Sequence, residues 1–292
     1  YKRQQQEAIY NYAERADEMN FTNTGDINIS RSNKEGIHNR SYNNNMEYNT
    51  LMSFDSDDGN ITITDTELSG IYNYPQNDTL IFRNNGNLNI SNTGEQGIYN
   101  YTYQQQSTIL FENDENGVID IQDVALDAIY NYSLIWDTTY TTKQVFDNSG
   151  TLKFSNLAHK GLHTNAYRRI DMDIINSGRI EANNVGEEAI FNKTRTDGSF
   201  LHSQLSFVNS GEIDITNNQK RAIYNLNENG IMDFISSGNI KIDTGTQEGI
   251  YNLNIRTSYD RYDSTAFVFQ NSGTIDIQTV SYTHLTLPTN RC

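Results

Sequence analysis

The chain has 292 residues, a formal net charge of −16 at pH 7 and a hydrophobic content of 35%. This acidic balance argues against binding to nucleic acid or to anionic lipid, because both need clustered Lys and Arg. No apolar run approaches the length of a membrane-spanning helix, so we expect no membrane insertion. The only cysteine is Cys292, which excludes a disulfide within the chain.

The most regular feature of the sequence is a tetrapeptide that recurs nine times at intervals of 27 to 34 residues. Its clearest form is Gly249-Ile250-Tyr251-Asn252. A short element repeated at such a period is typical of solenoids and other repeat arrays. The other eight copies begin at Ala8, Gly36, Gly70, Gly97, Ala128, Gly161, Ala189 and Ala222.

A second element follows each tetrapeptide after a segment of variable length. It contains a Phe, a turn glycine and an Ile-x-Ile pair, as in residues 269–277. Eight of the glycines precede the apolar residue of the next tetrapeptide by twelve residues, which predicts a fixed corner of the backbone. We expect positive φ at these turn glycines. They are Gly25, Gly59, Gly86, Gly117, Gly150, Gly178, Gly211, Gly238 and Gly273.

The apolar pattern predicts three short strands per repeat: x-Ile-Tyr-Asn, apolar-x-Phe and Ile-x-Ile. This alternation places one side chain inward and the next outward. One repeat cannot bury its Ile and Phe side chains, but stacked repeats can, and stacking also pairs the strand backbone groups. The predicted fold class is therefore an all-β solenoid with three short strands per coil and about nine coils of 27–35 residues. It forms a single domain over residues 1–279, uncapped at both ends.

Two other repeat architectures fit less well. Propeller blades have four strands and about 40–50 residues, more than each repeat offers. An array of β-hairpins needs constant turns between all strands, and the segment after the tetrapeptide varies in length.

The Ile-Tyr-Asn and Asn-Ser-Gly elements resemble the coils of right-handed parallel β-helix proteins of the pectate-lyase-like superfamily. They are most similar to Asn- and Gly-rich repeat regions of bacterial surface and secreted proteins. The resemblance covers residues 1–279. It implies a right-handed parallel β-helix at the bacterial cell surface or in the extracellular space. It does not select an activity, because the superfamily includes lyases, hydrolases, adhesins and spacers.

The repeat breaks near Val280, where His284, Leu287 and Pro288 stand at positions that do not fit the pattern. Residues 280–292 resemble a translated sequencing adapter of the kind found in assembled environmental sequence. We expect them to be a non-native or disordered tail, with a genuine capping segment as the alternative. Because the chain begins at Tyr1, close to its first repeat, we expect it to be a fragment of a longer parent protein.

The last residue of the tetrapeptide predicts a structural asparagine ladder. With Ile inward and Tyr outward, the Asn side chain points inward at a corner, where stacked amides hydrogen-bond along a column. Thr164 replaces Asn in one coil. The predicted ladder residues are Asn11, Asn39, Asn73, Asn100, Asn131, Asn192, Asn225 and Asn252.

Aromatic side chains occur at two kinds of position. The outward residue of the tetrapeptide forms a column of planar rings, for which we consider ring stacking and a sugar-binding stripe. The four long segments after the tetrapeptide, residues 40–51, 132–143, 193–204 and 253–266, leave from the same corner and carry further aromatics. As candidate ligand-binding residues on this edge we name Tyr42, Tyr48, Trp136, Tyr140, Phe200, Tyr259 and Tyr262.

Candidate catalytic and metal-binding residues are few. Asp55, Asp57 and Asp58 fall at a turn, where a solvated turn is the main interpretation and weak Ca²⁺ affinity the alternative. His159 and His163 are four residues apart but fall around a turn and not on a helix, so the i,i+4 zinc pattern does not apply. A lone cluster near Arg168 and Asp171 stays open, and we predict no catalytic residue, no metal site and no cofactor.

The sequence therefore favours a structural or adhesive extracellular repeat domain with polysaccharide or a host or cell-surface glycan as its partner. Enzymatic activity is left open, with absence favoured. The alternative is a polysaccharide lyase or glycoside hydrolase of the β-helix fold, which would need charged residues from adjacent coils to converge on one face.

Overall fold

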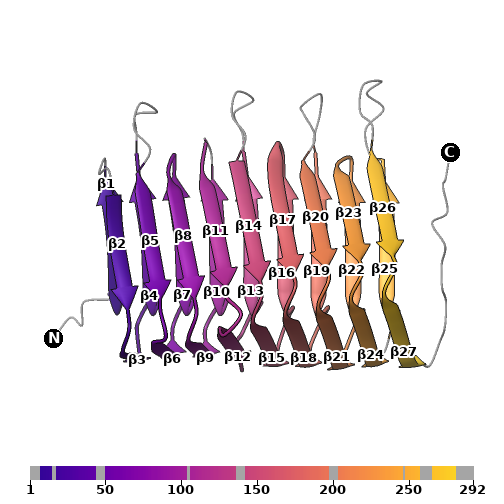
Figure 1. The fold of residues 1–292 in the computed structure, drawn as a ribbon, viewed down its shortest axis with the longest axis horizontal. Helices are drawn as coiled ribbons and strands as arrows, with labels where there is room; N and C mark the ends of the chain where they lie inside the picture. The colour runs from indigo at the N-terminus through magenta and orange to yellow at the C-terminus, as the bar shows by residue number, and fades with distance from the viewer. Residues whose placement is uncertain are drawn as a thin grey trace.

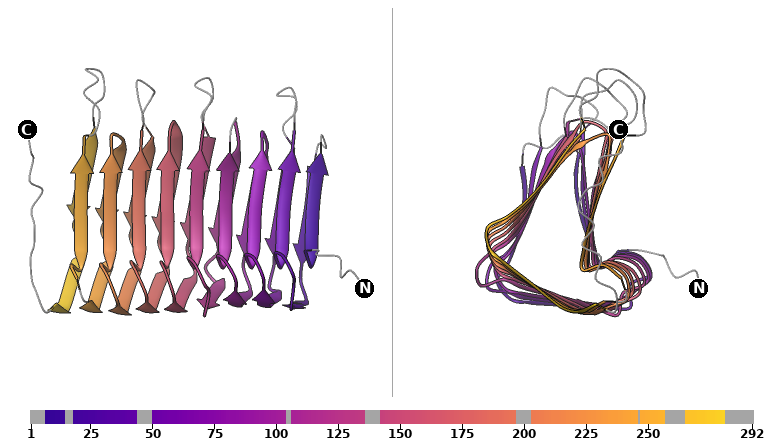
Figure 2. Two further views of the ribbon diagram at one scale, coloured as in Figure 1. Left: turned by 180° about the vertical axis from the view of Figure 1, so that it is seen from behind. Right: turned by 90° about the vertical axis from the view of Figure 1, so that its right-hand side faces the viewer.

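The computed structural model describes residues 7–14, 18–43, 50–103, 106–135, 142–196, 203–245, 247–256 and 265–280. Within these ranges the chain forms strands β1 to β27, three to a coil. The coils stack along one axis and enclose a roughly triangular cross-section (Figures 1 and 2). Viewed along the axis from the N-terminal end, the chain turns clockwise as it moves away from the viewer. The solenoid is therefore right-handed.

Sheet A contains the tetrapeptide of every coil, and its strands pair in parallel at equal repeat positions, as in Ile98 with Ile129. Ile and Asn are buried and the ring between them faces outward, as the alternation predicts. The strands are β1 (Ile9–Glu14), β4 (Ile37–Tyr42), β7 (Ile71–Gln76), β10 (Ile98–Tyr103), β13 (Ile129–Leu134), β16 (Leu162–Tyr167), β19 (Ile190–Arg195), β22 (Ile223–Glu228) and β25 (Ile250–Ile255).

Sheet B carries the Phe residues, which point inward and stack coil upon coil. The rings of Phe54 and Phe82 are 4.9 Å apart and nearly parallel. Ile174 interrupts the column in the sixth coil. The strands are β2 (Glu18–Asn23), β5 (Leu51–Ser56), β8 (Thr79–Asn84), β11 (Thr108–Asn113), β14 (Thr142–Asn148), β17 (Ile170–Asn176), β20 (Gln204–Asn209), β23 (Ile231–Ser236) and β26 (Ala266–Asn271).

Sheet C is formed by the Ile-x-Ile segments, and both Ile61 and Ile63 are fully buried. The strands are β3 (Asp26–Ser30), β6 (Asn60–Thr66), β9 (Asn87–Thr93), β12 (Val118–Gln122), β15 (Thr151–Leu157), β18 (Arg179–Val185), β21 (Glu212–Asn218), β24 (Asn239–Gly245) and β27 (Thr274–Val280).

All three sheets are nine-stranded and parallel over the described ranges, which confirms the predicted all-β solenoid with three strands per coil. Parallel pairing excludes the hairpin array, because adjacent strands there run in opposite directions. The last strand ends at Val280, and residues 281–292 of the predicted tail lie outside the described residues.

The prediction of positive φ at the glycines of the turn between sheets B and C is wrong. None of them has positive φ; a β-carbon on Gly211 would instead lie closer than 3.0 Å to the carbonyl oxygen of Gly178 in the preceding coil. Gly25, in the first coil, has no atom within 4 Å of that position. Glycine is therefore required where one coil backbone passes close over another.

Positive φ occurs instead at the turn that leads from sheet C to sheet A. One residue in each of seven coils has φ between 53° and 61°, and six of the seven are Asn or Asp, which tolerate this conformation best. They are Arg31, Asp65, Asn92, Asp123, Asn156, Asn184 and Asn217.

The asparagine ladder is confirmed in two sections. From Asn11 to Asn131 each side-chain amide donates to the amide oxygen of the next coil at 2.7–2.8 Å. The second section joins Asn192, Asn225 and Asn252. Thr164 separates the two sections.

A second ladder, which the sequence analysis did not predict, follows the turn between sheets B and C. Asn84 donates to Asn113, and the column continues at 2.7 Å to Asn148, Asn176 and Asn209. The same amide of Asn84 also donates to the carbonyl of Gly86, so these residues stabilise both the turn and the stack.

Candidate functional site

The outer face of sheet A carries the predicted column of rings, here called the ring column. Tyr72, Tyr99 and Tyr130 stack at 5.2–5.3 Å with interplanar angles of 24° and 5°. The column continues in both directions along the solenoid. Its members are Tyr10, His38, Tyr72, Tyr99, Tyr130, His163, Phe191, Tyr224 and Tyr251.

A second column of tyrosines lies beside it in the third to fifth coils. Tyr74, Tyr101 and Tyr132 stack at 5.3–5.5 Å, and each also contacts the ring-column tyrosine of its own strand. Tyr103 adds a third position in the fourth coil. Together these rings form what we call the tyrosine platform: Tyr72, Tyr74, Tyr99, Tyr101, Tyr103, Tyr130 and Tyr132.

The tyrosine platform is free of charged side chains. The third to fifth coils offer nine outward positions on sheet A, and the two not filled by tyrosine hold Gln76 and Leu134. Charge returns in the second coil, where Arg40 pairs with Tyr74 and lies 5.5 Å from its ring. In the sixth coil Asn165 stands beside Tyr132. The platform is therefore a neutral aromatic surface in the middle of an acidic protein.

Six phenols of the platform have raised pKa values and stay protonated over the physiological pH range: Tyr72, Tyr74, Tyr99, Tyr101, Tyr130 and Tyr132. Burial against neighbouring rings raises the pKa of Tyr130 to about 12 and raises the pKa values of Tyr72, Tyr99 and Tyr101 further. Each hydroxyl is therefore a neutral group that can both donate and accept a hydrogen bond.

The seven ligand-binding residues named from the sequence are only partly placed. Tyr42 ends β4, half-buried, beside Gln76 at the margin of the tyrosine platform. The other six lie outside the described residues: Tyr48, Trp136, Tyr140, Phe200, Tyr259 and Tyr262. Their binding role stays a prediction. In sequence, the segments that carry them follow the sheet A strands β4, β13, β19 and β25 and precede the next strands of sheet B.

The sequence analysis missed the second tyrosine column. Its signal is present as Tyr-Asn-Tyr, which occurs at Tyr72 to Tyr74, at Tyr99 to Tyr101 and at Tyr130 to Tyr132. Because side chains of a strand alternate, both tyrosines of this motif must face the same side.

The corner where each coil enters sheet A is lined by polar side chains that pair between coils. Arg221 lies between Glu248, at 3.1 Å, and Glu188, at 4.0 Å. The column consists of Glu7, Glu35, Ser69, Gln96, Asp127, Lys160, Glu188, Arg221 and Glu248, and is called the corner column below.

Beside the corner column, Glu187 accepts hydrogen bonds from two lysines of adjacent coils, Lys160 and Lys220. Burial alone would raise the pKa of Glu187, but these two ammonium groups outweigh it and lower the pKa to about 2. These charged groups pair with one another between neighbouring coils, so they have a structural role in the stacking of the coils.

The carboxylate cluster predicted to be a turn lies at the end of β5. Asp55 is 3.6 Å from Arg83, and the amide of Asn85 donates to both Asp57 and Asp58 at 3.3 Å. These contacts link neighbouring coils.

The arginines considered for catalysis lie between β16 and β17. Arg168 and Arg169 both have positive φ, and the Arg168 guanidinium lies 4.9 Å from the ring centre of Tyr167. Asp173 lies 3.8 Å from Lys143 on the neighbouring strand.

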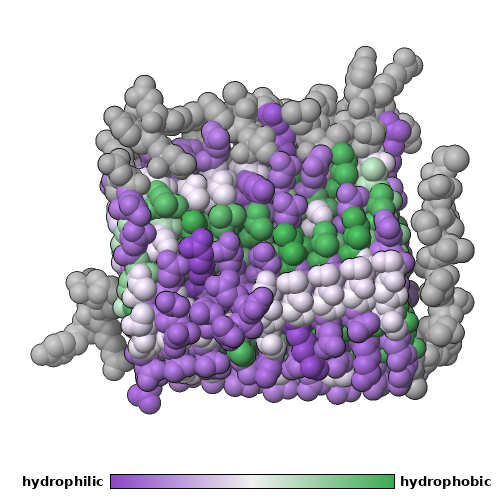
Figure 3. All heavy atoms as spheres, in the orientation of Figure 1, coloured by the Kyte–Doolittle hydropathy of each residue, from purple (hydrophilic) through white to green (hydrophobic). Residues whose placement is uncertain are grey.

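Outward side chains of sheet B form an apolar band that runs along the face seen in Figure 3. Each side chain is half-buried against its neighbours in the column, so the band adds to the packing between coils. The band shifts by one column along the solenoid, from Ile81, Leu110 and Val145 to Ile175, Val208 and Ile235.

One group of three carboxylate and imidazole side chains among the described residues is close enough to share an ion: Glu7, Glu35 and His38. Across the same residues no helix is long and apolar enough to cross a membrane. Comparison with known proteins finds no matching family, no matching curated protein and no matching solved structure.

Proposed function

We propose that this chain is a rigid repeat domain that binds neutral polysaccharide on the tyrosine platform of sheet A. The observation that supports the proposal is the uncharged group of seven tyrosines in three successive coils, held in fixed register by a parallel sheet. A location outside the cell or on a bacterial surface belongs to the same proposal.

The ring geometry leaves part of each aromatic surface available to a sugar. Parallel rings in contact are about 3.5–4.0 Å apart, so centroid distances of 5.2–5.5 Å include a sideways offset of about 4 Å. The rings are therefore offset-stacked, and each of them is partly exposed. Partly exposed faces fit the C–H groups of pyranose rings, and the neutral phenols can exchange hydrogen bonds with sugar hydroxyls.

The charge of the protein favours a neutral glycan over an acidic one. At −16 the chain repels polyuronates at low ionic strength, and the nine outward positions of the three platform coils hold no cation; Arg40 lies at the margin, 5.5 Å from the Tyr74 ring. The rigidity of the scaffold also favours a polymer, because a fixed row of contacts can be filled without ordering the protein.

The proposal is tested by affinity electrophoresis in gels that contain β-glucan, mannan or xylan, with polygalacturonate as the acidic comparison. Wild type should be retarded by at least one neutral polymer. The double variant Tyr99→Ala/Tyr101→Ala should lose at least about tenfold in affinity for that polymer.

The matched control is Tyr10→Ala/Tyr12→Ala, which removes the same Tyr-Asn-Tyr pair from the first coil, outside the platform. It should bind as wild type does. Equal loss in both double variants, or no retardation of wild type by any neutral polymer, would reject the platform as the binding surface. Circular dichroism verifies that both variants are folded.

A further inference from the structure

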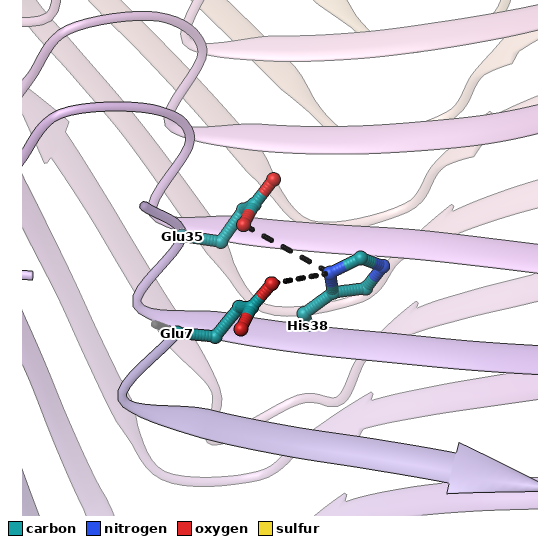
Figure 4. Close-up of side chains that lie close together, drawn as sticks. All are labelled: Glu7, Glu35 and His38. Carbon is teal, nitrogen blue, oxygen red and sulfur yellow. Dashed lines mark ion pairs between the residues drawn. The ribbon is translucent and has the colours of Figure 1, made fainter. Parts of the chain in front are cut away.

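Three potential metal ligands meet at the corner between the first two described coils. Glu7 and Glu35 are successive members of the corner column, and His38 belongs to the ring column on β4. Figure 4 shows both carboxylates turned toward the imidazole. Parallel stacking brings Glu7 and Glu35 together although they are separated by a whole coil of sequence.

The distances place the imidazole nitrogen between the two carboxylates. Nδ1 of His38 lies 3.8 Å from Oε1 of Glu7 and 3.8 Å from Oε2 of Glu35, beyond hydrogen-bonding distance in both cases. His38 is only 9% exposed, and neither of its ring nitrogens has a hydrogen-bond partner. Oε2 of Glu35 is also buried without one. Buried polar atoms without hydrogen-bond partners destabilise the fold, and a bound ligand at this cluster would relieve that loss of stability.

The corresponding group in the sixth coil differs because its imidazole already pairs with a carboxylate through Nδ1, although Nε2 of His163 is buried without a partner. His163 occupies the same column as His38, but its Nδ1 is hydrogen-bonded to Asp127 at 2.7 Å. The neighbouring corner position there holds Lys160, whereas the first two coils place two carboxylates next to each other. Lys34 contacts Glu7 at 2.9 Å, whereas Glu35 makes no ion pair with a lysine or arginine among the described residues.

We propose that Glu7, Glu35 and His38 bind a divalent transition-metal ion of the Zn²⁺ type, which links the first coil to the second. One imidazole with two carboxylates suits Zn²⁺ and its neighbours in the first row, and does not suit Mg²⁺ or Ca²⁺, which take oxygen ligands.

The geometry accommodates such an ion with small side-chain movements. Zn–N and Zn–O bonds of about 2.0–2.2 Å sum to slightly more than the observed 3.8 Å, so one ion can contact Nδ1 and either carboxylate at once. A divalent cation neutralises two adjacent carboxylates. Because Lys34 donates to Oε1 of Glu7, the oxygen that faces His38, binding of the ion through Oε1 requires Lys34 to move its contact to Oε2.

The test is calorimetric titration of the metal-free 292-residue chain with Zn²⁺. His38→Tyr is the informative variant, because Tyr occupies the same column in the coils on both sides and preserves ring stacking. Glu35→Gln removes the second ligand with little change of shape. Both variants should weaken the tight site at least about 100-fold, since loss of supporting contacts alone costs 10–100-fold.

The matched control is His163→Tyr, the same substitution in the same column, which should bind Zn²⁺ as wild type does. Hydrogen exchange locates the site: Zn²⁺ should slow exchange at residues 9–14 in wild type and not in His38→Tyr. Absence of tight binding in wild type, or equally tight binding after His38→Tyr, would overturn the assignment.

Discussion

The side-chain nitrogen of Asn131 and the side-chain oxygen of Asn192 lie two coils apart in one buried column, and neither has a hydrogen-bond partner. Thr164 stands between them, fully buried, and its hydroxyl is also without a partner. The ladder thus stops at one coil where an amide would continue it.

Thr164→Asn should therefore join the two sections of the ladder. The new amide can accept from Asn131 and donate to Asn192, and two hydrogen bonds at about 0.5–1.5 kcal/mol each predict a gain of about 1–3 kcal/mol. Urea unfolding measures the change. Thr164→Val, which removes the unpartnered hydroxyl but makes neither bond, is the control and should stabilise less than Thr164→Asn does. A Thr164→Asn variant no more stable than wild type would show that the break in the ladder serves packing instead.

The turn glycines give a second prediction, because only stacked ones are restricted. Gly211→Ala forces a methyl group against the Gly178 carbonyl of the preceding coil and should cost at least about 2 kcal/mol of unfolding free energy. Gly25→Ala meets no atom within 4 Å and should change stability by less than about 1 kcal/mol. Urea unfolding measures both changes. Equal losses of unfolding free energy in Gly211→Ala and Gly25→Ala would contradict the explanation by close approach of neighbouring coils.

We expect the ion pairs of Glu187 to make a contribution to folding stability that depends on pH. Its pKa in the folded chain is about 2, below the ordinary value of 4.5, so its ion pairs with Lys160 and Lys220 stabilise the fold above pH 4.5. This contribution is lost as the pH falls from 4.5 toward 2. The difference in melting temperature between wild type and Glu187→Gln should therefore be large at pH 7 and shrink toward pH 2.5.

The control for this measurement is Glu212→Gln, which alters a more exposed carboxylate 3.7 Å from Arg179. It should give a smaller difference at pH 7. A Glu187→Gln difference that stays constant from pH 7 to pH 2.5 would contradict the assigned pairing.

The sequence was sufficient for the parts of the fold that follow from local alternation. In Gly36-Ile37-His38-Asn39, period-two alternation directs Ile37 and Asn39 to the core and His38 to the outer face of sheet A, where neighbouring side chains bury it. Regular spacing then predicts stacking, and stacking predicts the hydrogen bond from Asn39 to Asn73.

Features that depend on contact between coils were not predicted. Positive φ at the turn glycines was wrong, because the close approach of Gly178 to Gly211 comes from the neighbouring coil and leaves no mark in the local sequence. Glu7, Glu35 and His38 were missed for a related reason: they become neighbours only when residues at equal repeat positions are placed in one column. Aligning the corner column from the sequence would have found them.

The tyrosine platform as the polysaccharide-binding surface is tested most directly by hydroxyl-radical footprinting with mass spectrometry, with and without the bound neutral polymer. The platform predicts that Tyr72, Tyr99, Tyr101, Tyr130 and Tyr132 become protected together, while Tyr10 and Tyr12 are oxidised as in the free protein. Protection confined to the connections between sheets A and B, at Trp136 or Tyr259, with the five platform tyrosines unchanged, would contradict it.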